Sequence, residues 1–136
     1  MTLPVGCVDF DGVLASWEEG SFAEPGPPIR GAQAFVEELA SFSRVIIWTC
    51  RTTEARYDES HGALQLKIWG WLVRWGFSGV SEVYAGQGKP YAAFYIDDKG
   101  VHCDPEHDTQ AFATSLKIAR AMCNNGKQHI NNGVSQ

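Results

Sequence analysis

Two short acidic motifs contain the residues best suited to chemistry. Asp9 and Asp11 follow an apolar run and precede Gly12, in the stretch VDFDG. Asp97 and Asp98 follow a second apolar run and precede a glycine in the same way, in the stretch YIDDKG. Because burial of unpaired carboxylates is costly, both motifs are expected at the exposed carboxyl ends of strands. Oxygen-rich sites of this kind suit hard cations such as Mg²⁺.

The two acidic motifs form one site only if their strands are neighbours. In open α/β sheets, ligands collect at the carboxyl ends of strands, where the strand order reverses. At such a point Asp9, Asp11, Asp97 and Asp98 would converge. Carboxylates within about 4–6 Å of one another oppose full ionisation, and a bound divalent cation removes that conflict. The sequence therefore predicts a metal site made by these four residues.

A hydroxyl and a cation, Thr49 and Lys89, complete the candidate site. Thr49 ends the apolar run IIWT, Arg51 follows it closely, and Lys89 stands alone before Pro90. Taken singly, Thr49 is an ordinary strand-end residue and Lys89 a solvated lysine, while Arg51 is either a substrate contact or part of a surface salt bridge. Together with an acidic metal site, Thr49 and Lys89 fit phosphoryl transfer, in which a carboxylate attacks phosphorus while the metal and the lysine neutralise the phosphoryl oxygens.

The surrounding elements must hold these residues at one sheet edge. Apolar runs predict four strands, at Pro4–Asp9, Arg44–Thr49, Ser81–Ala85 and Ala92–Asp97. Apolar spacing and capping residues predict three helices, at Gly31–Phe42, His61–Gly76 and about Asp108–Cys123. This alternation predicts an α/β fold, a three-layer Rossmann-like sandwich with a mainly parallel sheet. Residues 1–123 are expected to form a single domain, and the polar residues 124–136 a flexible tail.

The motifs resemble those of the haloacid dehalogenase (HAD) superfamily of phosphohydrolases. DFDGVL, the threonine of IIWTC, Lys89 and YIDD match the four motifs of that family in order, over Val5 to about Asp104. The finer pattern is similar to small HAD proteins of bacteria and phages. The intervals Leu14–Arg44 and Cys50–Gly88 have no room for the cap domain that many members carry. The resemblance therefore implies a capless HAD-like fold with an open site, over which the loop Ala15–Arg30, with Trp17 and Phe22, is a candidate flap.

The resemblance also implies catalytic roles. Asp9 would be the nucleophile that forms an aspartyl-phosphate. Asp11 would be the general acid that protonates the leaving group and then the base that activates water. The phosphoryl group would be bound by Thr49 and by backbone N–H groups of Phe10, Asp11 or Cys50, and Arg51 is our candidate contact for a substrate anion.

The implied cofactor is Mg²⁺. Its ligands would be Asp9, the backbone carbonyl of Asp11, and either Asp98 or Asp97. We favour Asp98 as the ligand, with Asp97 pairing Lys89, which would bridge the Asp9 carboxylate and the phosphate. The sequence predicts a phosphomonoester phosphatase acting on a small phosphorylated substrate.

Composition limits the partners and the cellular location. The formal net charge is −5 without any run of Lys or Arg, which argues against stable binding to duplex nucleic acid. The four cysteines form no CxxC pair and complete no zinc spacing with the histidines, so reduced thiols are expected. We identify no secretion signal and no stretch of about 20 apolar residues, so no membrane association and a cytoplasmic location are expected.

Several alternatives stay open at the level of sequence. One is a catalytically idle HAD-like module that binds a phosphorylated ligand or partner. A polynucleotide 3′-phosphatase and a transferase that uses DxD to hold a metal-bound diphosphate are others. Residues 102–108 offer metal-binding side chains but lack a recognised ligand spacing. The tryptophans Trp69, Trp71 and Trp75 either pack in the core or form a homodimer surface.

Overall fold

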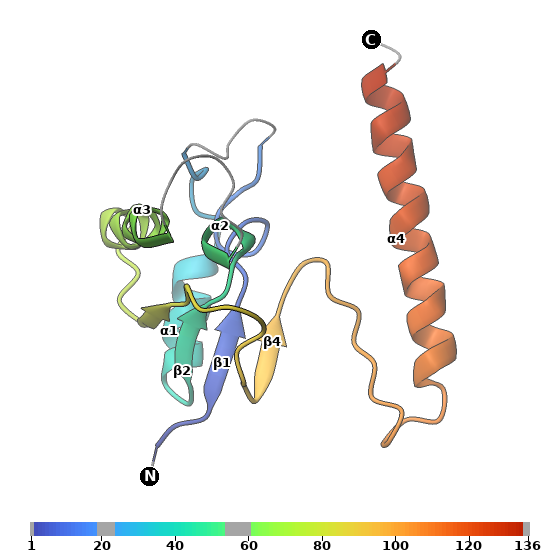
Figure 1. Ribbon diagram of the computed structural model, residues 1–136, viewed down its shortest axis with the longest axis horizontal. Helices are drawn as coiled ribbons and strands as arrows, with labels where there is room; N and C mark the ends of the chain where they lie inside the picture. Colours follow the sequence, from blue (N-terminus) through green and yellow to red (C-terminus); the bar gives the residue numbers. More distant parts are fainter. Residues whose placement is uncertain (1, 19–23, 54–60, 135–136) are drawn as a thin grey trace. The chain divides into compact units, whose positions relative to one another are not determined.

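The computed structural model describes residues 2–18, 24–53 and 61–134. The chain divides into two compact units, Met1–Asp98 and Lys99–Gln136, and the sheet lies in the first (Figure 1). Residues 19–23 of the predicted flap, Phe22 among them, lie outside the described residues. The single domain expected over residues 1–123 stays a prediction.

The first unit is built on a four-stranded, wholly parallel sheet. Its strands are β1 (Val5–Val8), β2 (Arg44–Ile47), β3 (Val80–Val83) and β4 (Phe94–Ile96). Their order is β3-β2-β1-β4, so β1 and β2 are the central strands. The residues of β1 from Gly6 to Val8 are buried, as are those of β2 from Val45 to Ile47. An α/β fold with a parallel, Rossmann-like sheet is therefore confirmed.

Each strand at the candidate site ends before the residues with reactive side chains. β1 ends at Val8 and β4 at Ile96, one residue before the Asp9 and Asp97 that the predicted strands included. β2 likewise ends at Ile47, two residues before Thr49. The polar residues thus lie at or just beyond the carboxyl ends of their strands, and the backbone N–H of Asp9 still bonds to β4.

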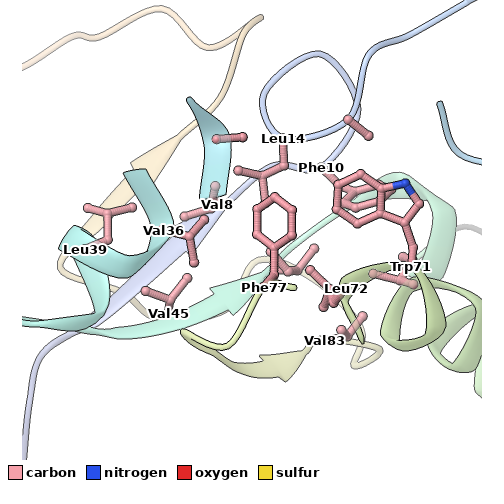
Figure 2. Close-up of a cluster of buried hydrophobic side chains, with 14 residues drawn as sticks. Val8, Phe10, Leu14, Val36, Leu39, Val45, Trp71, Leu72, Phe77 and Val83 are labelled. Carbon is pink, nitrogen blue, oxygen red and sulfur yellow. The ribbon is translucent and has the colours of Figure 1, made fainter. Parts of the chain in front are cut away.

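Two helices, α1 (Ala32–Ala40) and α3 (His61–Arg74), cover one face of this sheet. The side chains of Val8, Val45 and Val83 point to that face and pack with helix residues in a single apolar cluster (Figure 2). The cluster also includes Phe10, Leu14, Val36, Leu39, Trp71, Leu72 and Phe77. Two of the three predicted layers, the sheet and one helical layer, lie within this unit, and the third stays a prediction.

The helix α3 stops where the sequence indicated. Gly76 has a φ of 75°, and the N–H of Phe77 donates to the carbonyl of Leu72 at 2.8 Å. A glycine in the left-handed region followed by such a bond is a common helix C-terminus. The hydrogen bond of Phe77 and the conformation of Gly76 both agree with the predicted role of Gly76 as the helix end.

The three tryptophans of α3 differ in their surroundings. Trp71 is buried against Phe10, with ring centroids 4.8 Å apart, and its indole N–H donates to the carbonyl of Gly26 at 2.8 Å. Trp69 packs partly buried against the core, while Trp75 is 39% exposed. Core packing therefore holds for Trp71, and the homodimer surface stays a prediction.

The second unit contains α4 (Ala111–Val134), which differs from its predicted bounds. Asp108 precedes it as expected, and its carboxylate accepts a hydrogen bond from the N–H of Gln110 at 2.9 Å. The expected end near Cys123 is wrong, because the helix continues through most of the segment predicted as a tail. Asn and Gly are weak helix formers, but once a helix has formed each further residue adds a backbone hydrogen bond at little additional cost.

Within the described part of the chain, no helix combines the length and the apolar character that crossing a bilayer requires. This holds for α4 although it has 24 residues.

Candidate active site

The two acidic strand ends lie side by side in the structure. β1 and β4 are parallel neighbours, with Val8 opposite Ile96, and the N–H of Asp9 donates to the carbonyl of Ile96 at 2.9 Å. The chain proceeds from β1 through β2 to β3 in one direction, and then β4 adds to the other side of β1. The strand order therefore reverses between β1 and β4, which is where α/β sheets bind ligands.

Three of the four predicted carboxylates converge at this point. Asp9, Asp97 and Asp98 each offer an oxygen atom, and these oxygens lie within 4.8 Å of one another. We call these three residues the carboxylate cluster. Among the described residues it is the one group of His, Cys, Asp or Glu side chains with a geometry suited to a metal ion. An all-oxygen donor set of three carboxylates fits a hard divalent cation.

Electrostatics around Asp9 favour a cation. Burial, opposed by a 2.8 Å hydrogen bond from the N–H of Phe10 and reinforced by the neighbouring carboxylates of Asp97 and Asp98, raises the pKa of Asp9 from 3.8 to about 7. Asp9 therefore ionises less readily in the protein alone than an exposed aspartate does. A divalent cation bound to the carboxylate cluster would favour the ionised form.

Gly12 allows Asp98 to approach the loop that follows β1. Its φ is 80°, and a Cβ atom added there would lie 2.5 Å from Oδ2 of Asp98. The loop itself is fixed by Phe10, whose buried ring packs in the core and whose carbonyl accepts hydrogen bonds from the N–H groups of Leu14 and Ala15. The glycine of the first acidic motif thus makes room for a carboxylate of the second.

Asp11 is engaged by Arg51 rather than grouped with the other carboxylates. Nε of Arg51 donates to Oδ2 of Asp11 at 2.6 Å, and Nη2 donates to Oδ1 at 2.8 Å. The two side chains are only 5% and 16% exposed, and the indole of Trp17 lies with its ring centroid 5.8 Å from the guanidinium carbon. Side-chain ligation of the metal by Asp11 is therefore absent from this geometry, and ligation by its backbone carbonyl stays a prediction.

The sequence analysis did not predict the pair of Asp11 and Arg51. It assigned Arg51 to a substrate anion, although a surface salt bridge was the stated alternative. A signal was available, because Asp11 and Arg51 each stand a few residues beyond the ends of adjacent strands, β1 and β2. Sequence alone does not show that the side chains turn toward each other.

Thr49 lies at the same edge of the sheet and caps a short helix that was not predicted. This helix, α2 (Cys50–Thr53), begins directly after Thr49. The Thr49 hydroxyl is buried and accepts a hydrogen bond from the N–H of Arg51 at 3.3 Å, which is a typical N-cap contact. Thr49 therefore helps to place the backbone of Arg51, and its contact with a phosphoryl group stays a prediction, as does that of Cys50.

Lys89 contacts an aromatic ring in the structure. Its ammonium nitrogen lies 4.2 Å from the ring centroid of Tyr95, a cation–π contact. Tyr95 pairs with Cys7 of β1, and both alternate with the residues that face the helical layer, so Lys89 lies toward the opposite face of the sheet. Its expected pairing with Asp97 and its bridge between Asp9 and phosphate stay predictions.

Residues 102–108 form a loop that leads to the N-terminus of α4, where Asp108 accepts a hydrogen bond from the N–H of Gln110. His107 Nδ1 lies 3.0 Å from both carboxylate oxygens of Asp104, and both residues are exposed. This pair of i and i+3 residues precedes α4 and lies in the second unit.

Comparison with family models, with curated proteins and with solved structures gave no match to this chain.

Proposed function

We propose that this chain is a magnesium-dependent phosphohydrolase of the HAD type that cleaves a small phosphomonoester. The observation that carries the proposal is the meeting of Asp9, Asp97 and Asp98 at the carboxyl ends of β1 and β4. The resemblance of the four motifs to HAD phosphohydrolases supplies the chemistry that such a site would perform. A cytoplasmic location belongs to the same proposal.

Asp9 is the proposed nucleophile because it occupies the centre of the site. Its backbone joins β1 to β4, and the N–H of Phe10 fixes one of its carboxylate oxygens. In the first step, a carboxylate oxygen of Asp9 bonds to phosphorus while the bond from phosphorus to the leaving oxygen breaks. The leaving oxygen takes a proton from the Asp11 carboxyl group.

In the second step the aspartyl-phosphate is hydrolysed. Asp11, now a carboxylate, takes a proton from a water molecule whose oxygen bonds to phosphorus. The bond from phosphorus to Asp9 breaks, which releases inorganic phosphate and restores the carboxylate. Asp11 therefore serves first as an acid and then as a base.

The carboxylate cluster fits Mg²⁺ by its donor chemistry and by the raised pKa of Asp9 without a cation. Asp9 and Asp98 are the proposed side-chain ligands, with Asp97 as the alternative to Asp98 and the backbone carbonyl of Asp11 as a further ligand. When bound, Mg²⁺ would neutralise negative charge between the nucleophile and the phosphoryl oxygens.

The test is magnesium-dependent release of phosphate from p-nitrophenyl phosphate. We expect turnover with Mg²⁺, none with EDTA, and a loss of about 10³-fold or more in Asp9→Asn, since removing a nucleophile leaves only residual catalysis. Glu106→Gln, which neutralises an exposed carboxylate in the second unit, is the control and should retain the full rate. Full activity of Asp9→Asn would contradict the assignment.

A trapped intermediate separates an enzyme from an idle binding module. Beryllofluoride with Mg²⁺ should form an adduct on Asp9 that mimics the aspartyl-phosphate, detectable by ¹⁹F magnetic resonance and lost in Asp9→Asn. Absence of the adduct together with binding of phosphorylated ligands would favour the idle module instead.

A further inference from the structure

The pair of Asp11 and Arg51 is unusual in its burial and in its geometry. Two parallel N–H donors of one guanidinium meet the two oxygens of one carboxylate at 2.6 and 2.8 Å. Such a bidentate contact fixes the plane of the carboxylate as well as its position. Ion pairs with so little exposure contribute little net stability, because desolvation of both charges offsets their attraction. A contribution to folding stability therefore does not explain the pair, and a role in the site is the better explanation.

Arg51 is itself held from two sides. Its backbone N–H donates to the hydroxyl of Thr49, which ends the stretch that follows β2. The Trp17 indole, on the loop that follows β1, lies 5.8 Å from its guanidinium carbon. The guanidinium thus has a fixed position relative to the ends of β1 and β2. Its two N–H donors therefore fix the orientation of the Asp11 carboxylate.

We infer that Arg51 is a positioning residue that aims the Asp11 carboxyl group for proton transfer. This inference rests on the proposed phosphohydrolase function and deepens it. Asp11 lies two residues after the nucleophile Asp9, in a loop where rotation about its side-chain bonds would otherwise change the direction of its oxygens. The fork of Arg51 selects one orientation, and the same orientation serves proton donation to the leaving group and proton removal from water.

A contact with the substrate anion makes a different prediction from a positioning role. An anion contact acts on every phosphomonoester alike, because all carry the same phosphoryl group. A positioning role acts through proton transfer to the leaving oxygen, so it matters most when that oxygen leaves poorly without a proton. Two substrates of nearly equal shape, phenyl phosphate and p-nitrophenyl phosphate, differ in this respect, since p-nitrophenolate leaves readily as an anion.

The experiment compares kcat/KM for these two substrates, with Mg²⁺ present, in the full-length protein and in Arg51→Ala and Arg51→Lys. Because kcat/KM reports on the steps up to and including the first phosphoryl transfer, it responds to the first proton transfer and leaves out the second. We expect kcat/KM for phenyl phosphate to fall by about 10²-fold or more in Arg51→Ala, within the range of general acid catalysis, and that for p-nitrophenyl phosphate to fall by less than about tenfold. Arg51→Lys, which keeps the charge without the fork, should change the ratio in the same direction.

Two further readouts separate positioning from a general effect on folding. Guanidinium ion, at concentrations that do not unfold the protein, should restore activity of Arg51→Ala toward phenyl phosphate. With p-nitrophenyl phosphate the variant should release a stoichiometric burst of p-nitrophenol, because the second step, which needs Asp11 as a base, becomes slow. Arg44→Ala removes a half-exposed pair of Arg44 and Glu82 at 3.3 Å and serves as the matched control, with an unchanged substrate ratio.

Equal losses toward both substrates in Arg51→Ala and Arg51→Lys, without burst or rescue, would overturn the inference. If the unmodified protein with Mg²⁺ hydrolyses neither substrate, the proposed function itself fails and the role of Arg51 fails with it. The two failures are distinguishable, because the first occurs in an active protein.

Discussion

A single glycine determines how closely the two acidic motifs approach. Gly12 combines a φ of 80° with a position where an added Cβ would lie 2.5 Å from Oδ2 of Asp98. Gly31 offers a comparison, because its φ is 90° but an added Cβ would meet no atom within 4 Å. Both glycines therefore adopt a backbone conformation that other residues reach only with strain, and only at Gly12 would an added Cβ also meet the carboxylate cluster.

The first prediction follows from this comparison. Gly12→Ala and Gly31→Ala should each cost about 1–3 kcal/mol in the free energy of unfolding, because alanine is strained at positive φ. Gly12→Ala should in addition weaken Mg²⁺ binding by displacing Asp98, whereas Gly31→Ala should not. Urea unfolding measures the first effect and calorimetric titration with Mg²⁺ the second. Equal Mg²⁺ affinity in the two variants would contradict the role assigned to Gly12.

The second prediction concerns the pH dependence of stability in the metal-free protein. The pKa of Asp9 rises from 3.8 to about 7 on folding, chiefly by burial. The folded state therefore holds this proton more tightly, so the stabilising contribution is complete below about pH 4 and is lost as pH rises through about 7. Asp9→Asn cannot ionise, so its free energy of unfolding, compared with that of the unmodified protein, should increase over this range.

Urea unfolding in EDTA at several pH values measures the effect of Asp9→Asn, with Glu106→Gln as the control for loss of one exposed carboxylate. A difference between Asp9→Asn and the unmodified protein that stays constant with pH would contradict the assigned shift at Asp9.

At the scale of elements, α3 connects the core to the loop beside the site. Its residues Ile68, Trp71 and Leu72 are buried in the core. The indole N–H of Trp71 donates a hydrogen bond to the carbonyl of Gly26 in the proline-rich loop. The same helix exposes Leu66, with 72% of its surface accessible. One face of α3 thus anchors two parts of the first unit, while apolar residues also occur on its outer face.

The third prediction uses these two leucines of one helix. Leu72→Ala removes a fully buried side chain and should cost about 2–5 kcal/mol in the free energy of unfolding, since it leaves a cavity. Leu66→Ala, with the same change in helix propensity, should stay within about 0.5 kcal/mol of the unmodified protein. Urea unfolding of both variants is the measurement. Similar costs for the two would show that α3 is oriented differently.

At the scale of the whole molecule, the site exists only in the folded chain. Asp9 and Asp98 are far apart in sequence and are brought together by the pairing of β1 with β4. A cation bound by both therefore stabilises the folded state and adds little to the unfolded one. Because Asp9 and Asp98 belong to the first unit, this coupling does not depend on how that unit sits relative to α4.

The fourth prediction is that Mg²⁺ raises the thermal midpoint of unfolding. At a concentration of 100 times the dissociation constant, the expected stabilisation is about 2.7 kcal/mol. Asp98→Asn should remove most of this shift, and NaCl at equal ionic strength should not reproduce it. An equal shift in Asp98→Asn would indicate that the ion binds elsewhere.

The sequence by itself determined the parts of this protein that depend on local pattern. Apolar runs that end in Asp9, Thr49 and Asp97 indicated parallel strands whose carboxyl ends carry polar groups, because a buried strand cannot hold unpaired charge. That the two acidic motifs form one site was predicted only on the condition that their strands are neighbours, and the strand order β3-β2-β1-β4 meets this condition. The helix stop at Gly76 followed from the conformational freedom of glycine.

Only the tertiary structure decided the contacts between side chains that local pattern leaves free. Arg51 contacts Asp11, and Lys89 contacts Tyr95. A long cationic side chain can reach several partners, and the fold decides which of them lies close enough to bind. The length of α4 likewise exceeds what the weak helix propensities of its last residues indicated. Strand ends are set by neighbours in the chain, whereas ion pairs and close approaches such as that of Asp98 to Gly12 are set by neighbours in space.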